Sequence, residues 1–78
     1  MPDPRLLRTV SVVLKIDAES VRLTTSQENT PTWDSMAHLL LILHIEEALG
    51  VRFHSDEIPH LTSVGSIQEA LERLGVRG

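Results

Sequence analysis

The residues whose types and spacing suit chemistry lie close together, at Asp34, Ser35 and His38. A serine acts as a nucleophile only when an adjacent base, an orienting group and oxyanion donors surround it. A triad of these residues can be drawn, but no Gly-x-Ser-x-Gly turn surrounds the serine, and 78 residues leave little room to enclose a substrate. A small serine hydrolase therefore remains an alternative rather than the main hypothesis.

Ser35 also lies at the expected first position of a helix, directly after Asp34. Unpaired N–H groups and the helix dipole at such a position favour an anion, above all a phosphate ester. The aspartate is a good N-cap, because its carboxylate can accept hydrogen bonds from N–H groups two or three residues further on. We therefore interpret Ser35 as a point of attachment and Asp34 as the cap of its helix.

The histidines do not follow a metal-binding pattern. No two of them lie three or four residues apart on one helix: His38, His44, His54 and His60. Because the chain also lacks cysteine, we expect no metal site. We interpret His38 as a structural histidine that the preceding loop covers. Trp33 is expected to pack that loop onto the helices, with a role in docking as the alternative.

The elements that must position this serine are helices. Apolar residues at helical spacing predict a first helix that ends between Lys15 and Asp17, with Leu6, Leu7, Val10, Val13 and Leu14 on one face. The following segment, 17–33, is polar and has no sustained period. We expect a long loop there, anchored to the core by Val21 and Leu23.

The second helix is expected to run from the Asp34 cap to Leu49 and to end at Gly50. Its predicted core stripe is Leu39, Ile42, Ile45 and Leu49. A separate arc points away from the core and contains Met36, Leu40, Leu43 and Glu47. Leu41 is expected to pack against a neighbouring helix, and Glu46 to reach solvent near the helix end. We interpret the outward apolar strip as a docking surface, with burial under the loop or simple exposure as the alternative.

Two more helices are expected in the last third of the chain. Ser55 can cap one or two turns, which Pro59 keeps short. Thr62 or Ser63 can cap the last helix, which is expected to end at Gly75 and to bury Val64, Ile67, Leu71 and Leu74. The sequence thus predicts an all-α fold: a four-helix bundle with a long loop between helices 1 and 2 and a very short helix 3.

The composition predicts a single domain, residues 1–78, and narrows its partners. The net charge is −4 and the basic residues are scattered, which argues against binding to nucleic acid. The N-terminus lacks the apolar segment of a signal peptide, and the longest apolar run, residues 39–43, is far too short to span a membrane. Together with the absence of cysteine, these features favour the cytoplasm. We expect a monomer.

The segment from Trp33 to Phe53, WDSMAHLLLILHIEEALGVRF, followed by TSVGSI at residues 62–67, resembles an acyl carrier protein. That family has an Asp-Ser-Leu motif at the start of its second helix. Asp34-Ser35-Met36 matches the motif, with methionine in place of leucine. The resemblance covers most of the chain and is weakest in the first helix and the loop.

The resemblance implies that a phosphopantetheinyl transferase esterifies Ser35 with 4′-phosphopantetheine from coenzyme A, whose terminal thiol then holds acyl groups as thioesters. It implies that Asp34 contacts the transferase and that the protein catalyses nothing itself. The implied partners are acyl-transferring or condensing biosynthetic enzymes. In the family, partners dock on the second helix at the positions that correspond to Met36, Ala37, Leu40, Leu43 and Glu47.

Two positions depart from the carriers of fatty acid synthesis, which commonly have acidic residues where this chain has Ala37 and Leu40. Docking is therefore expected to depend more on apolar contact than on charge pairing. The Trp-Asp-Ser form resembles free-standing carriers of secondary metabolism, such as polyketide pathways, and the Gly-Gly-x-Ser surround of peptidyl carriers is absent. A fatty-acid-synthesis carrier and an unmodified helical interaction module with the same fold are the alternatives.

Overall fold

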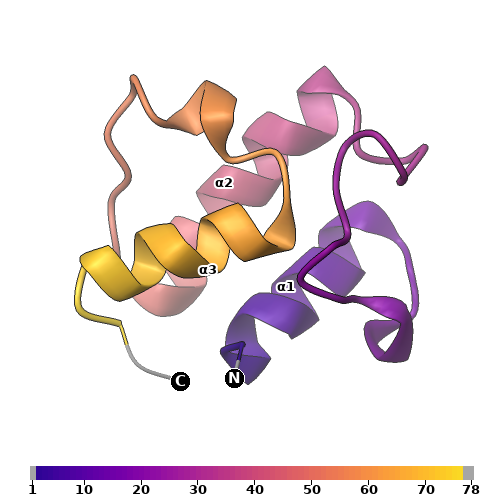
Figure 1. Ribbon diagram of the computed structural model, residues 1–78, viewed down its shortest axis with the longest axis horizontal. Coiled ribbons are helices and arrows are strands. Elements are labelled where there is room, and N and C mark those ends of the chain that lie inside the picture. Colours follow the sequence, from indigo (N-terminus) through magenta and orange to yellow (C-terminus); the bar gives the residue numbers. More distant parts are fainter. Residues whose placement is uncertain (1, 77–78) are drawn as a thin grey trace.

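The computed structural model describes residues 2–76, and its α-helices in that range are α1 (Pro4–Leu14), α2 (Ser35–Leu49) and α3 (Val64–Arg73). Two 3₁₀ helices, η1 (Ala18–Ser20) and η2 (Ile58–His60), lie in the connections (Figure 1). The only β geometry within residues 2–76 is an isolated bridge between Ser26 and Ser63. The predicted all-α class is therefore confirmed.

The segment expected to form a very short helix 3 forms the single 3₁₀ turn η2. The prediction that Ser55 caps it is wrong, because Glu57 precedes the turn and makes no side-chain cap hydrogen bond. Pro59 lies in the first positions of the turn, and proline has no N–H with which to extend a helical ladder. Residues 2–76 thus contain three α-helices, with η2 where a fourth was expected.

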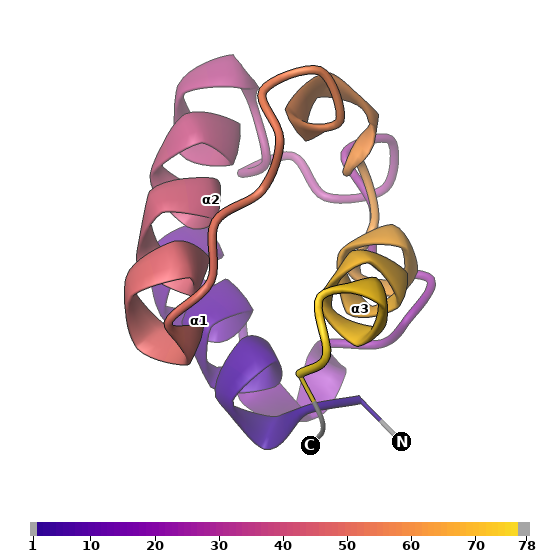
Figure 2. The ribbon, with the colours of Figure 1, turned by 90° about the vertical axis from the view of Figure 1, so that its left-hand side faces the viewer.

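The core lies between the three α-helices. Helix α1 packs along α2, and Figure 2 shows these two helices on one side of the molecule with α3 across from them. Their facing side chains form one buried apolar cluster together with residues of the connections, namely Val21, Trp33, Phe53 and Leu61. Leu6, Val10 and Leu14 are the buried residues of α1, and Leu7 and Val13 pack at its margin, as the helical spacing predicted.

Helix α1 has an end that the sequence predicted and a cap that it did not. Lys15 ends the helix with a left-handed φ of 57°, at the first residue of the predicted range. Pro4 occupies the first turn, where its fixed φ and missing N–H suit a helix. The cap is Asp3, whose carboxylate accepts a hydrogen bond from Arg5 N at 2.9 Å. Asp3 is fully buried, which is unusual for a charged residue.

The long loop between α1 and α2 is held mainly by its backbone. Val21 is buried as predicted, but the prediction for Leu23 is wrong, because its side chain is largely exposed. Leu23 contributes its carbonyl instead, which accepts a hydrogen bond from Gly65 N at 2.9 Å. A Cβ atom on Gly65 would lie 3.0 Å from this carbonyl oxygen, so the close approach favours glycine. Backbone pairing of this kind leaves no apolar pattern in the sequence.

Helix α2 buries a different face from the one predicted. Leu39 was expected in the core, but 60% of its surface is exposed, so that prediction is wrong. The buried residues are His38, Leu41, Ile42, Ile45 and Leu49. Leu41 is fully buried, as its expected contact with a neighbouring helix requires. Because α2 is apolar on almost every side, the helical period alone does not fix which face meets α1 and α3.

The ends of α2 and α3 follow local signals. Gly50 ends α2 with a φ of 65°, as predicted. Ser63 caps α3 in a reciprocal arrangement with Ser66. The prediction that Leu74 is in the core is wrong, because 41% of its surface is exposed; α3 ends at Arg73 and the chain turns at Gly75. No helix in the described part of the chain has the length and apolar character needed to cross a bilayer.

Candidate functional site

The candidate site lies at the start of α2. Asp34 has extended backbone geometry and caps the helix as predicted: its Oδ1 accepts from Ala37 N at 2.8 Å and its carbonyl from His38 N at 2.9 Å. Ser35 is the first helical residue, and both Asp34 and Ser35 are exposed. The structure therefore places the serine hydroxyl at the surface, at the positive end of a 15-residue helix.

The N–H groups at this helix start are accessible to an anion. Among the hydrogen bonds of residues 2–76, none involves Ser35 N, Met36 N or the Ser35 hydroxyl. The start of α3 is different, because Val64 N donates to Thr25 O and Gly65 N to Leu23 O. The long loop thus covers the start of α3 and leaves the start of α2 open.

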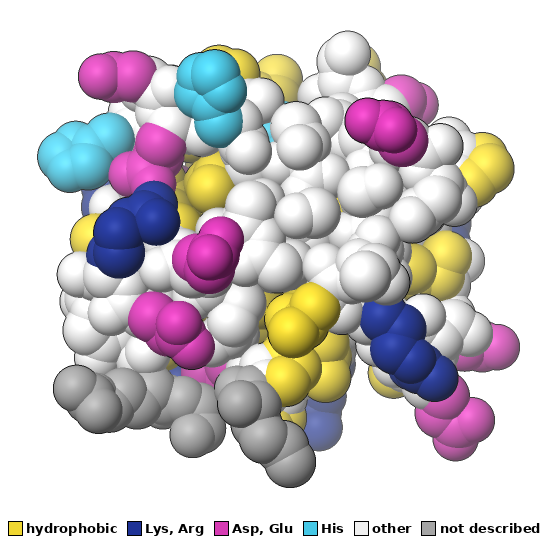
Figure 3. All heavy atoms as spheres, in the orientation of Figure 1, with side chains coloured by type: hydrophobic (Ala, Val, Ile, Leu, Met, Phe, Trp, Pro, Cys, Tyr) yellow, Lys and Arg dark blue, Asp and Glu magenta, His cyan; other side chains and the backbone are white. Residues whose placement is uncertain are grey.

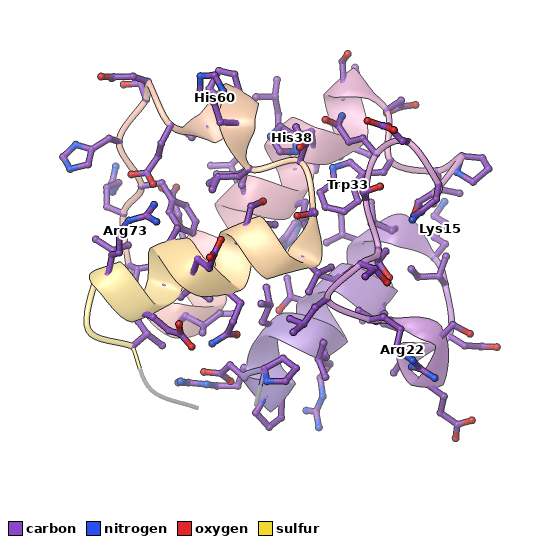
Figure 4. All side chains as sticks on the ribbon, viewed as in Figure 1. Lys15, Arg22, Trp33, His38, His60 and Arg73 are labelled. Carbon is purple, nitrogen blue, oxygen red and sulfur yellow. The ribbon has the colours of Figure 1, made fainter. Side chains whose placement is uncertain are left out.

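His38 and Trp33 form a buried pair beside the exposed serine. Trp33 is 2% exposed and His38 is 7% exposed. The indole Nε1–H donates to His38 Nδ1 at 3.0 Å, and the two rings are stacked with centroids 6.0 Å apart. The other ring nitrogen of His38, Nε2, lies 2.8 Å from the carbonyl oxygen of Ile58 in η2. Figure 4 shows Trp33 and His38 side by side near the N-terminal end of α2. Both residues are structural, as expected.

This pair leaves no base for a serine nucleophile at Ser35. Both nitrogens of the His38 ring are engaged, one with Trp33 and one with Ile58. The Asp34 carboxylate, which would have to orient that ring in a triad, bonds to Ala37 N instead. The three residues drawn as a triad from the sequence are therefore close in the chain but are not connected as a catalytic unit.

An apolar ridge runs along α2 from the serine. It consists of Met36, Leu39, Leu40 and Leu43, whose exposed fractions are 72%, 60%, 47% and 58%. Three of these residues were predicted to point outward, and Leu39 widens the strip. Glu47 is exposed beyond it, whereas Ala37 is half-buried against the core. Exposed apolar side chains gathered on one helix face mark an interaction surface more often than scattered ones do.

Other faces of the molecule have a different character. Asp and Glu side chains are spread over the face that carries α3 and η2 (Figure 3), and Glu57 pairs there with Arg73 at 3.1 Å. Glu46, expected to reach solvent, is half-buried and accepts a hydrogen bond from Phe53 N at 2.9 Å. It therefore holds the segment after α2 and is not part of the ridge. Within residues 2–76, no three His, Cys, Asp or Glu side chains are placed to hold a metal ion.

Sequence reasoning missed Leu39 as a ridge residue and the bond between Trp33 and His38. The position of Leu39, three residues after Met36, was compatible with the outward face, but its apolar character assigned it equally well to the core. The aromatic pair has a weak local signal, a tryptophan just before the cap and a histidine in the first turn. Comparisons of the sequence with protein-family models and with curated proteins give no match.

Proposed function

We propose that the chain is a free-standing acyl carrier protein that bears 4′-phosphopantetheine on Ser35. The observation that carries this proposal is the exposed serine at the open start of α2, with the apolar ridge beginning at the next residue. The motif Asp34-Ser35-Met36 supports the same reading. In this proposal η2 takes the place of the short third helix of a four-helix carrier fold.

The residues present suit a phosphate-linked group at this position. The Ser35 hydroxyl is exposed, so a transferase can reach it. The N–H groups of Ser35 and Met36 lie where the helix dipole favours negative charge. When bound, the arm supplies a terminal thiol for thioester chemistry, which a chain without cysteine lacks. Attachment forms a bond from Ser35 Oγ to phosphorus, breaks the pyrophosphate bond of coenzyme A with release of adenosine 3′,5′-bisphosphate, and passes the hydroxyl proton to a base of the transferase.

The apolar ridge is proposed to dock the partner enzymes. Burying one large apolar side chain gains about 1.5–3 kcal/mol. A few such side chains are largely offset by an association cost of roughly 4–15 kcal/mol, so docking is weak and reversible. Leu40 and Ala37 bring no charge to this surface, and α2 contains no lysine or arginine. We therefore expect docking that depends more on apolar contact than on salt-sensitive charge pairing, with Glu47 as the one acidic docking residue, which favours a carrier of secondary metabolism over one of fatty acid synthesis.

Intact-mass spectrometry tests the proposal. The protein is incubated with coenzyme A and a promiscuous phosphopantetheinyl transferase, and we expect its mass to rise by one arm in the wild type and not in Ser35→Ala. An unmodified interaction module would gain no mass with any transferase. A serine hydrolase would instead show esterase activity that Ser35→Ala abolishes.

A further inference from the structure

We propose that the side-chain bond between Trp33 and His38 is a brace that positions Asp34 and Ser35 for modification, an inference that rests on the proposed function. Trp33 directly precedes the Asp34-Ser35 pair, and His38 lies three residues after the serine. Trp33 and His38 are buried, whereas Asp34 and Ser35, where the transferase must act, are exposed. The brace therefore fixes the residues before and after the exposed Asp34-Ser35 pair.

The hydrogen-bond chemistry of the brace is unambiguous. An indole N–H can only donate, so the His38 Nδ1 that accepts from it carries no proton. The neutral ring then has its proton on Nε2, which donates to the carbonyl of Ile58. No buried side-chain nitrogen or oxygen in residues 2–76 lacks a partner. His38 thus makes two separable contacts, one to the flank of the motif and one to η2.

The contact between Trp33 and His38 joins the residues on the two sides of the Asp34-Ser35 motif. Backbone bonds already join His38 N to Asp34 O and Ala37 N to the Asp34 carboxylate. These bonds fix the first turn of α2, and the bond from Trp33 N to Thr30 O at 2.9 Å fixes the turn before the cap, but none of them joins Trp33 to α2. The bond from Trp33 Nε1 to His38 Nδ1 makes that connection, and so fixes the direction in which Asp34 and Ser35 leave the preceding turn. The contact to Ile58, by comparison, holds η2 and does not touch the motif.

The two contacts can be separated with matched variants. In His38→Asn the amide oxygen takes the place of Nδ1 and keeps the bond to Trp33, while the bond to Ile58 is lost. In His38→Gln the amide nitrogen takes the place of Nε2 and keeps the bond to Ile58, while Trp33 loses its acceptor. Each variant loses one neutral hydrogen bond, so their stabilities are expected to fall by similar amounts. A difference between them in modification therefore does not report on stability.

Steady-state kinetics of modification by the transferase is the first measurement. If the brace keeps the motif in its reactive conformation, a fall in that population to about a tenth raises KM about tenfold and leaves kcat unchanged. We expect this result for His38→Gln and for Trp33→Phe, which removes the same bond from the other side. His38→Asn is expected to keep KM within about threefold of the wild type. Equal kinetics for His38→Asn and His38→Gln would overturn the proposal.

Amide hydrogen exchange by NMR gives a second measurement that needs no transferase. We expect the amides of Ala37 and His38, which bond to Asp34, to exchange about tenfold faster in His38→Gln than in His38→Asn. Equal exchange in the two variants would overturn the brace itself. If the two variants show the exchange difference but the wild type is never modified, the brace stands as a structural device and the proposed function fails.

Discussion

Helices α1 and α2 both begin with an aspartate cap, and the two caps differ in burial and in their hydrogen-bond partners. Asp3, at the start of α1, is 1% exposed, and its carboxylate accepts from Arg5 N at 2.9 Å, Nε at 3.1 Å and Nη2 at 2.8 Å. Its own N–H donates to Gln68 Oε1 on α3 at 3.0 Å. Asp34, at the start of α2, is exposed and accepts one hydrogen bond with its side chain.

The same sequence signal can therefore bury the start of a helix or leave it exposed. At α1 the cap is joined to a basic partner and to a residue of another helix, so the start of α1 is part of the packed structure. At α2 the carboxylate satisfies one N–H and leaves the next residue, Ser35, facing outward. A helix start that presents its first residue is suited to attachment, whereas one that is packed is not.

The largest effect is expected at the packed cap. Asp3→Ala removes the charged acceptor of three hydrogen bonds, and we expect the free energy of unfolding to fall by about 2 kcal/mol. Urea denaturation followed by circular dichroism measures this. Modification of Ser35 should stay unchanged at temperatures where the variant is folded. A loss below about 0.5 kcal/mol would contradict the structural role of Asp3.

At Asp34, the exposed cap of α2, we expect a smaller effect on stability than at Asp3 and a larger effect on the modification of Ser35. Asp34→Ala should lower the free energy of unfolding by about 1 kcal/mol, because one cap hydrogen bond is lost. Transfer of the arm to Ser35 should fall at the same time, because the start of α2 loosens and the proposed contact of Asp34 with the transferase is lost. Intact mass followed over time measures the rate. Asp3→Ala is the control, since it destabilises the fold without touching the site.

The charge of Asp3 gives the packed cap a pH dependence. Hydrogen bonds from Arg5 lower the pKa of the Asp3 carboxyl from its usual value, while burial opposes the shift. Its charged form therefore adds stability above the usual carboxyl pKa, and this stability is lost as the pH falls through the lower pKa of the folded state. We expect the stability difference between the wild type and Asp3→Asn to shrink below about pH 4. A difference that stays constant down to pH 2 would contradict this.

The smallest effect on stability is expected on the ridge. Leu40→Glu should change the free energy of unfolding by less than about 0.5 kcal/mol, because the side chain already lies at the surface. Docking to a cognate condensing enzyme should weaken, since a charge replaces an apolar contact. Val12→Glu is the matched control, because Val12 is an exposed apolar residue of α1 outside the ridge. Unfolding of Leu40→Glu would show that Leu40 belongs to the core.

Features that depend on neighbouring residues were predictable from the sequence, and features that depend on distant partners were not. The Asp34 cap, the Ser63 cap and the Gly50 end each follow from a few adjacent residues. The burial of Asp3 depends on Gln68, which is 65 positions away. Leu39 and Leu41 are chemically identical, and only the direction from which α1 and α3 approach decides which one is buried. Leu23 binds through its carbonyl, which no side-chain pattern reveals.

The most direct test of the central claim is to locate the added group in the modified protein by fragmentation mass spectrometry. The wild type and Ser55→Ala, which removes another exposed serine, are expected to carry one 4′-phosphopantetheine on Ser35 after incubation with coenzyme A and a transferase. Ser35→Ala is expected to carry none. Addition at a different residue, or no addition to the folded wild type with several transferases, would contradict the account.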